Sequence, residues 1–405
     1  MRISLLRRVV GQLPSVEPVH ESAEPMFGEY GTPERGISVV QAFDPVEVEY
    51  AAVRRHAAVF DQPHTGVLEF RGPDRASFLN RMLSQNLADL GPGWSRNSFL
   101  LDRKGRIAAD LRVVQLAERT LALGEVFAVE RAKEALDKYI IAEDVTVADL
   151  TGTHHVLSVH GPAAAAIVAG ACDEGSAGVA EIAAGSTLER VVAGAPAVIE
   201  RQDWCGEIGL TLVVEAARAK AVYGAVSTPW SARGPGDAAA QQTALARRVG
   251  WHALNIARIE AGTAVYMLDF GPDSLPHETG DATLADRVSF KKGCYLGQEI
   301  VARMQSLGHP KQKLVGLRAS GSAPGGSSQA QATTGTAVLE SAEAGAAVVG
   351  AVTSSAFSPM NSGEHVCFAM VKWSFTAAGK VVYLDTGGEP VAATVQAGLS
   401  FLKRT

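Results

Sequence analysis

The pattern of hydrophobic positions divides the chain into regions of different periodicity. Residues 1–43 show no periodicity and are predicted to be an extension. From about residue 45 to residue 262, apolar runs of strand length alternate with amphipathic helical stretches. From Leu314 onward, short valine-rich segments replace them. The pattern predicts an α+β region followed by a β domain.

The first predicted helix begins at Asp44-Pro45, because aspartate suits the N-cap and proline suits the first helical position. It is expected to end near Asp61. Another helix is predicted over residues 239–262, where Gly262 is placed to stop it. One face of the first helix would carry Val46, Tyr50, Val53, Ala57 and Phe60.

Between these helices lies an internal repeat. The apolar run 67–73 ends in Gly-Pro and leads into a predicted helix at Asp74–Leu83, and the run 156–162 leads into Ala163–Ala169 in the same way. A hairpin and a further helix are predicted next in each half: 98–101 with 106–114 and then 129–140, and 197–200 with 207–214 and then 215–227. The repeat predicts two related α+β subdomains, about 45–150 and 151–255, with 256–315 as a closing segment of a region 44–315.

The C-terminal region, 316–405, is predicted to be a small antiparallel β-barrel. Residues 319–330 are rich in Gly, Ser, Ala and Gln, which is typical of a flexible loop or linker. The predicted strands that follow are 336–339, 347–353, 366–371 and 381–384.

Composition narrows the class of protein. With 405 residues, 47% hydrophobic and 20% charged, the chain is predicted to be a soluble globular protein of two or three domains. The formal net charge of -6 argues against general nucleic-acid affinity. No apolar stretch is long enough for a membrane span.

The four cysteines are Cys172, Cys205, Cys294 and Cys367, and they lie far apart. This spacing fits neither a zinc site nor a disulfide framework and indicates a reducing compartment, so a cytoplasmic location is expected. The histidines show no ligand spacing, and no metal site is predicted. Arg2, Arg7 and Arg8 leave an organelle matrix as the alternative location.

The chemically densest stretch is Lys291–Arg303. Gly293 and Gly297 allow its backbone to turn sharply. Lys292 lies two residues before Cys294, and a nearby cation favours the reactive thiolate. The alternative is a packed loop whose cysteine behaves as a small hydrophobe. The candidate catalytic residues are Cys294, Lys292, Gln298 and Glu299.

Within this stretch, the run Lys-Gly-Cys-Tyr-Leu-Gly-Gln-Glu at residues 292–299 resembles the signature of YgfZ-type folate-binding proteins, a branch of the glycine-cleavage T-protein (aminomethyltransferase) superfamily. The segments 258–262 and 355–359 also resemble motifs of that family. The resemblance implies two related folate-binding α+β subdomains and a C-terminal barrel around a central folate pocket. It implies tetrahydrofolate as the cofactor and iron–sulfur proteins or assembly factors as partners.

The candidate folate-binding residues are Glu207, Arg258, Asn86 and Tyr266. The resemblance points to Glu207 and Asn86 and places Arg258 in a family motif, whereas the Tyr266 ring could stack on a ligand ring. Glu207 follows a glycine and would accept hydrogen bonds from the two N–H groups of the pterin edge. The alternatives are an exposed turn glutamate at 207, a structural ion pair at Arg258 and a packing role for Tyr266. Asn86 stands where the T-protein pattern has an aspartate, and an amide cannot take up a proton.

The leading functional hypothesis is therefore a tetrahydrofolate-binding protein that supports iron–sulfur cluster assembly or repair. The alternative is a tetrahydrofolate-dependent enzyme that transfers a one-carbon (aminomethyl or methyl) unit. The local excess of basic residues suggests an anionic partner, either polyglutamylated folate or tRNA, although a solvated basic face is the alternative. These residues are Arg287, Lys291, Lys292, Arg303, Lys311, Lys313 and Arg318.

Overall fold

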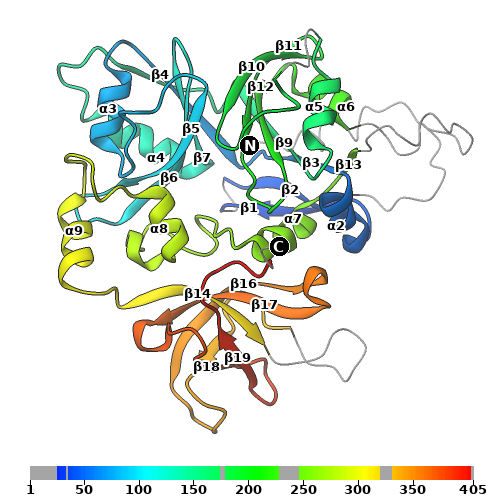
Figure 1. The fold of residues 1–405 in the computed structure, drawn as a ribbon, viewed down its shortest axis with the longest axis vertical. Coiled ribbons are helices and arrows are strands. Elements are labelled where there is room, and N and C mark those ends of the chain that lie inside the picture. The colour runs from blue at the N-terminus through cyan, green and yellow to red at the C-terminus, as the bar shows by residue number, and fades with distance from the viewer. Residues whose placement is uncertain (1–24, 33–34, 174–177, 228–245, 320–330, 403–405) are drawn as a thin grey trace, which may run out of the picture.

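The computed structural model describes residues 25–32, 35–173, 178–227, 246–319 and 331–402. Two α+β units lie side by side, and a closed barrel packs beneath them (Figure 1). The barrel has six strands, and every pairing within it is antiparallel. The α+β class and the C-terminal antiparallel barrel are thus confirmed.

The first unit is a five-stranded sheet in the order β5-β6-β7-β4-β8, covered by two helices. Its Gly-Pro junction requires glycine, because Gly72 has φ +102° and a Cβ there would lie 2.0 Å from the carbonyl oxygen of Asp144. The elements are β4 (Thr65–Arg71), α3 (Arg75–Met82), β5 (Trp94–Leu101), β6 (Ile107–Gln115), β7 (Thr120–Glu125), α4 (Val126–Asp137) and β8 (Thr146–Asp149).

The second unit is a six-stranded sheet in the order β10-β11-β12-β9-β3-β13. Gly161, at the matching Gly-Pro junction, has φ +123°, and a Cβ there would lie 2.4 Å from the carbonyl oxygen of His56. The elements are β3 (Ala57–Asp61), β9 (His154–His160), α5 (Ala164–Gly170), β10 (Thr187–Val192), β11 (Ala195–Arg201), β12 (Gly209–Glu215), α6 (Ala219–Val226) and β13 (Ala246–Arg248).

The strand orders show the internal repeat directly. The run β5-β6-β7-β4 of the first sheet corresponds to β10-β11-β12-β9 of the second, and a helix follows the equivalent strands. The predicted pairing of hairpins was wrong by one strand, because β11–β12 corresponds to β6–β7 and not to β5–β6. The Asp-to-Gly turns at 102–105 and 203–206 look alike in sequence but occupy different places in the repeat.

Three further expectations were wrong in detail. Helix α2 (Val46–Arg55) ends before residues 57–61, which form the buried strand β3. A strand buried on both faces shows no alternation, so its apolar residues also fit a helical face. Part of the helix predicted over 239–262 is strand β13, and the helix itself is α7 (Trp251–Ala261); residues 239–245 lie outside the described chain. The predicted N-terminal extension contains a hairpin, β1 (Met26–Tyr30) with β2 (Ile37–Ala42), and residues 1–24 are not described.

The barrel strands close in the order β14-β17-β16-β15-β18-β19. Helices α8 (Asp281–Arg287) and α9 (Gln298–Leu307) lie in the segment that leads into them. The linker residues 320–330 are outside the described part of the chain. The strands are β14 (Gln312–Ala319), β15 (Ala337–Leu339), β16 (Val348–Ser358), β17 (Glu364–Lys372), β18 (Val381–Leu384) and β19 (Val391–Val395).

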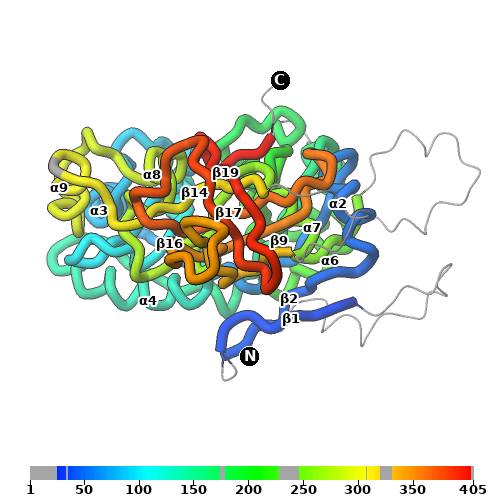
Figure 2. The backbone as a smooth tube through the Cα atoms, turned by 90° about the horizontal axis from the view of Figure 1, so that it is seen from below, coloured from blue at the N-terminus to red at the C-terminus, as the bar shows by residue number. Residues whose placement is uncertain are grey.

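Helix α7 joins the α+β units to the barrel through buried polar contacts. Glu260 accepts hydrogen bonds from Tyr50 Oη at 2.6 Å and from Ser358 Oγ of the barrel at 2.5 Å. It also forms an ion pair with Arg54 at 2.6 Å. Figure 2 shows the barrel from below, with α7 behind it and the β1–β2 hairpin at one edge of the molecule. The motif at residues 258–262 therefore holds the barrel on the α+β region.

Candidate functional site

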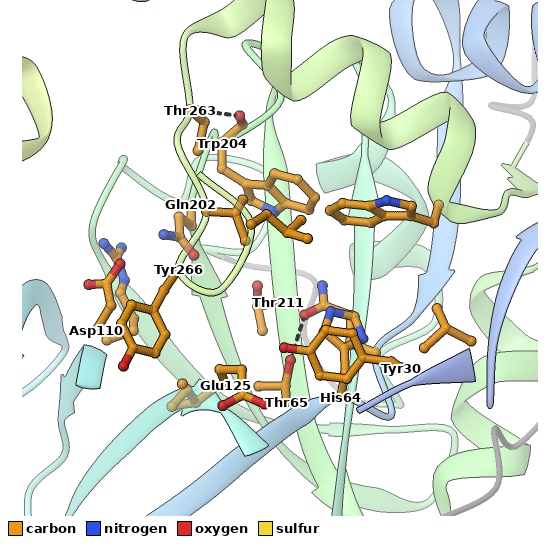
Figure 3. Close-up of a pocket in the computed structure, with 18 of the residues that line it drawn as sticks. Tyr30, His64, Thr65, Asp110, Glu125, Gln202, Trp204, Thr211, Thr263 and Tyr266 are labelled. Atoms are coloured by element: carbon orange, nitrogen blue, oxygen red, sulfur yellow. Dashed lines mark hydrogen bonds between the residues drawn. The ribbon is translucent and has the colours of Figure 1, made fainter. Parts of the chain in front are cut away.

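A cavity of about 370 Å³ lies where the two sheets meet. Its described walls come from β6 and β7 of the first sheet, β11 and β12 of the second, the β1–β2 hairpin, the connection from β3 to β4, helices α7 and α8, and the segment that follows α7. In Figure 3, Asp110 and Tyr266 lie on one side of it, and Tyr30 and His64 lie on the opposite side. Residues distant in the sequence thus share one concave site.

The polar wall of the cavity is built from charged side chains on strands. Asp110 and Arg112 are two residues apart on β6, so they point to the same face of the sheet. Asp110 pairs with Arg287 of α8 at 2.8 Å, and both side chains are almost buried. Arg112 pairs with Glu200 of β11 and thereby links the two sheets. The cavity therefore contains carboxylates in fixed orientations.

The opposite wall is aromatic. The ring centroid of His64 lies 5.6 Å from that of Tyr30 and 6.3 Å from that of Trp251. Burial lowers the pKa of His64 to about 4, although the nearby Asp61 raises it in part, so its imidazole is neutral at neutral pH. Burial, aided by Glu125, raises the pKa of the Tyr30 hydroxyl, which stays protonated. This wall offers flat apolar surfaces with neutral polar edges.

The segment after α7 forms a further wall of the cavity. The Thr263 hydroxyl donates to the Trp204 carbonyl at 2.7 Å, as Figure 3 shows. The Tyr266 hydroxyl donates to the carbonyl oxygens of Ile107 and Ala108 at 3.2 and 3.1 Å. Burial raises the pKa of Tyr266 to about 12. The segment is therefore fixed to both sheets, with the Tyr266 ring facing the cavity.

Two family models match the chain. The GCVT N-terminal domain matches residues 17–292, and the glycine cleavage T-protein C-terminal barrel domain matches residues 312–403. The chain belongs to the glycine cleavage T-protein family. Its membership of the YgfZ-type branch stays a prediction.

Related proteins of this T-protein family are similar over most of the chain. An aminomethyltransferase of Streptomyces coelicolor is 30% identical over 361 residues, which cover 88% of this chain and 89% of that protein. A probable aminomethyltransferase of Natronomonas pharaonis is 25% identical over 390 residues, which cover 95% of this chain and 97% of that protein. The crystal structure of glycine cleavage system aminomethyltransferase T from Bartonella henselae has the same fold, with a TM-score of 0.76, 24% identity and coverage of 93% and 94%.

Of the predicted folate-binding residues, Tyr266 lines the cavity. The described lining does not include Glu207, Arg258 or Asn86. Glu207 pairs with Arg54 at 3.2 Å, and the Asn86 side chain donates to Asp89 at 3.0 Å. These three predictions gain no geometric support as direct contacts.

Arg258 has a different place. It is fully buried, pairs with Asp269 at 2.5 Å and donates to Ser354 Oγ of the barrel at 2.5 Å. Asp269 also accepts from the backbone N–H of Val265 at 2.8 Å. Arg258 thus supports the cavity-lining segment from behind, as the structural alternative expected.

The predicted catalytic residues lie on another part of the surface, and the described cavity walls include none of them. Cys294 is exposed, Gln298 and Glu299 begin α9, and α9 lies at the outer edge of the molecule (Figure 1). Gly297 has φ +79°, and a Cβ there would lie 2.5 Å from the carbonyl oxygen of Asp102. The loop therefore packs on the turn between β5 and β6.

Lys292 serves the backbone of the neighbouring segment. Its ammonium donates to the carbonyl oxygens of Asn80, Leu83 and Gln85 at 2.5, 2.7 and 2.9 Å. An ammonium has three N–H donors, so these bonds use all of them. Burial lowers the pKa of Lys292 to about 8. A catalytic role of the Cys294 loop remains a prediction that these contacts do not support.

Asp110, Arg112 and Glu200 were missed in the sequence. The available signal was two charges two residues apart on a strand whose other positions are mostly apolar, Ile-Ala-Ala-Asp-Leu-Arg-Val-Val. Such charges mark one polar face of a strand. The sequence alone does not say whether that face meets solvent or a cavity.

The described surface offers little support for the anionic partner that the basic stretch predicted. Of the seven basic residues, Lys313 and Arg318 pair with Asp281 and Glu364, and Arg287 pairs with Asp110, so these three are neutralised. Within the described residues, no group of three or more His, Cys, Asp and Glu side chains is arranged to hold a metal ion. No helix in the described ranges is long and apolar enough to cross a membrane.

Proposed function

We propose that this protein is a tetrahydrofolate-dependent one-carbon transferase that works in the central cavity. The observation that carries the proposal is the pairing, in one concave site, of an aromatic wall with oriented carboxylates. The family and its relatives named aminomethyltransferase support the same reading. The sequence argument against transfer was the amide at Asn86, but the cavity has an aspartate of its own, Asp110.

The chemistry of the lining fits a folate. The rings of Tyr30, Trp204 and Tyr266 offer flat surfaces for a planar heterocycle. Glu200 and Asp110 offer carboxylate oxygens that accept hydrogen bonds from ring N–H groups. A volume of about 370 Å³ lies within the usual range of ligand pockets, roughly 300–1,000 Å³.

Asp110 is the residue best placed for chemistry. Tetrahydrofolate, when bound, would supply the ring nitrogens that carry the one-carbon unit. Arg287 holds the Asp110 carboxylate in one orientation, and Asp110 in turn presents negative charge to the cavity. A preorganised carboxylate stabilises positive charge that develops on an amine donor and can accept its proton. Arg287 acts through Asp110 as a positioning residue.

The cavity walls also control water. Tyr266 and Thr263 are fixed by hydrogen bonds to the two sheets, and Leu268 adds an apolar side chain to the same wall. A rigid, partly apolar wall beside Asp110 strengthens its electrostatic effect, because the local dielectric constant is lower than that of water. The segment after α7 would thus protect a reactive one-carbon unit from hydrolysis.

The test is a titration with tetrahydrofolate followed by an assay of methylene-tetrahydrofolate formation. Candidate donors are the aminomethylated lipoyl carrier protein and small N-methyl amines, the latter with an electron acceptor because their carbon must be oxidised. Saturable binding with turnover is the expected result. Absence of binding contradicts the proposal, and binding without turnover by any donor restricts the protein to folate binding.

A second candidate function is support of iron–sulfur enzymes in the cytoplasm. The observation that favours it is the exposed Cys294 within the run at 292–299, which resembles the YgfZ-type signature. We propose to measure iron–sulfur enzyme activities in cells that depend on the Cys294→Ala variant. A loss of those activities with unchanged folate binding supports this role, and wild-type activities argue against it.

A further inference from the structure

Four described histidines bury a ring nitrogen that has no hydrogen-bond partner: His64, His160, His277 and His365. Burying a polar atom without a partner carries a desolvation cost, so each such atom needs an explanation. Of these four, His64 is the member that lines the central cavity. Its Nδ1 is the unpartnered atom.

The position of His64 suits a ligand contact. Its ring lies among Tyr30, Phe60 and Trp251, with centroid distances of 5.6, 6.0 and 6.3 Å. Figure 3 shows it beside Tyr30 at the cavity wall. The Tyr30, Phe60 and Trp251 rings confine the imidazole without a hydrogen bond to Nδ1. The ring is thus held by packing, while its polar atom remains unsatisfied.

The charge state of His64 supports the same role. Burial lowers its pKa to about 4, so the ring is neutral at neutral pH. A neutral imidazole has one N–H donor and one acceptor nitrogen. It can therefore bond a polar heterocycle without bringing a buried charge to the aromatic wall.

We propose that His64 is a ligand-binding residue whose ring forms a hydrogen bond with a polar nitrogen or oxygen of the folate heterocycle. This inference rests on the proposed function. Nδ1 is shielded from solvent, but rotation of the ring by about 180° around χ2 exchanges Nδ1 with Cδ2 within the same aromatic slot. Ligand binding would select the orientation in which the nitrogen is satisfied.

The inference predicts a loss of affinity that depends on the hydrogen bond and not on the aromatic ring. His64→Phe keeps the flat ring and removes both nitrogens. The Asn and Leu side chains have nearly the same shape, but only Asn can form a hydrogen bond with the ligand. His64→Asn and His64→Leu are therefore compared directly. His365→Phe is the matched control, because His365 also buries an unpartnered nitrogen but lies on barrel strand β17, outside the cavity lining.

The experiment measures the Kd of tetrahydrofolate by calorimetry, the melting temperature, and KM and kcat for each variant. We expect His64→Phe to raise Kd about tenfold, which corresponds to about 1.4 kcal/mol. His64→Asn should bind more tightly than His64→Leu. KM should rise while kcat changes little, as for a contact made equally in the ground and transition states. His365→Phe should leave Kd unchanged.

The outcomes separate the two proposals. If the wild-type protein binds tetrahydrofolate and His64→Phe binds equally well, the role of His64 is wrong and the proposed function stands. If the wild-type protein does not bind it, the proposed function fails and this inference fails with it. If His64→Phe does not fold, the Asn and Leu variants decide, and equal Kd values for these two overturn the inference.

Discussion

The loop around Cys294 and the central cavity differ in how their chemistry is distributed along the chain. The loop gathers a thiol, an amide, a carboxylate and several cations into residues 291–303. In the structure these groups face solvent or bond to the backbone, as Lys292 does. The cavity draws its polar groups from segments between Glu29 and Arg287. Chemical density in a sequence therefore does not indicate where side chains converge in space.

The reason lies in the geometry of sheets. Successive side chains of a strand point to opposite faces, so each strand gives a cavity only one or two residues. Asp110 and Arg112 come from β6, Glu200 comes from β11, and Thr211 comes from β12. The loop, in contrast, uses its side chains for packing and for bonds to backbone, as Lys292 does with three carbonyl oxygens and Gly297 does against the β5–β6 turn. We expect substitutions in the cavity and its frame to have larger effects than those in the loop.

The largest effect is expected at the frame of the cavity. Arg258→Met leaves the carboxylate of Asp269 buried without its cation, and breaking a buried pair in this way costs about 3–5 kcal/mol. Arg35→Met is the control, because Arg35 and its partner Glu130 are both exposed. This substitution should change stability by less than about 0.5 kcal/mol. Urea denaturation compares the two variants. Equal stabilities of the two variants would show that the Arg258–Asp269 pair does not stabilise the fold.

The next effect concerns catalysis at the cavity wall. Asp110→Asn should lower kcat/KM by about 100-fold or more, as expected for a group that stabilises charge in the transition state. Asp286→Asn is the matched control, because Asp286 also pairs with Arg287 but is not part of the described cavity lining. Steady-state kinetics with both variants separate the cavity carboxylate from its neighbour. Similar losses in the two would indicate that only the position of Arg287 matters.

Two glutamates sharpen the comparison for binding. Glu200→Gln should weaken tetrahydrofolate binding by about 1.5–3 kcal/mol, the range for a hydrogen bond to a charged group. Glu207→Gln should change it much less, because Glu207 pairs with Arg54 and the described cavity walls do not include it. Calorimetric titration measures both. The opposite order would restore the folate contact expected for Glu207 from the family resemblance.

Stability should also depend on pH through buried histidines. Burial lowers the pKa of His64 to about 4 and that of His160 to about 3. The ordinary pKa of histidine is about 6.5. Between that pH and the lowered pKa of each folded histidine, the unfolded chain binds more protons than the folded one, so folding stability is lost as the pH falls. Each histidine contributes up to about 1.4 kcal/mol per pH unit. Urea denaturation from pH 7 to pH 4 should give a shallower slope for His160→Phe than for the wild-type protein.

The smallest effect is expected in the loop. Cys294→Ser should change folding stability and tetrahydrofolate affinity by less than about 0.5 kcal/mol, because Cys294 is exposed and outside the described cavity lining. Cys294 should nevertheless react with iodoacetamide before Cys205 and Cys367, which are buried and whose pKa values are raised by burial. Peptide mapping follows the alkylation. A large loss of folate affinity in Cys294→Ser would show that the loop and the cavity form one site.

The sequence predicted the fold better than the site. Hydrophobic patterning and Gly-Pro junctions such as that at Gly72 were sufficient for the repeated α+β units, and short valine-rich runs were sufficient for the barrel. Strand β3 was missed because a fully buried strand and one face of a helix have similar compositions. Tyr266 was proposed because an aromatic ring after the helix could stack on a ligand ring, and it lines the cavity. Asp110 was missed because which strand faces meet at the cavity depends on how the two sheets pack.

The central claim is that folate binds between the two sheets, and the most direct test is a crystal structure with tetrahydrofolate. The account predicts ligand density in the central cavity, with the heterocycle against Tyr30, Trp204 and Tyr266 and within hydrogen-bond distance of Asp110 or Glu200. Ligand density against Cys294 and α9, with the central cavity holding only water, would contradict it.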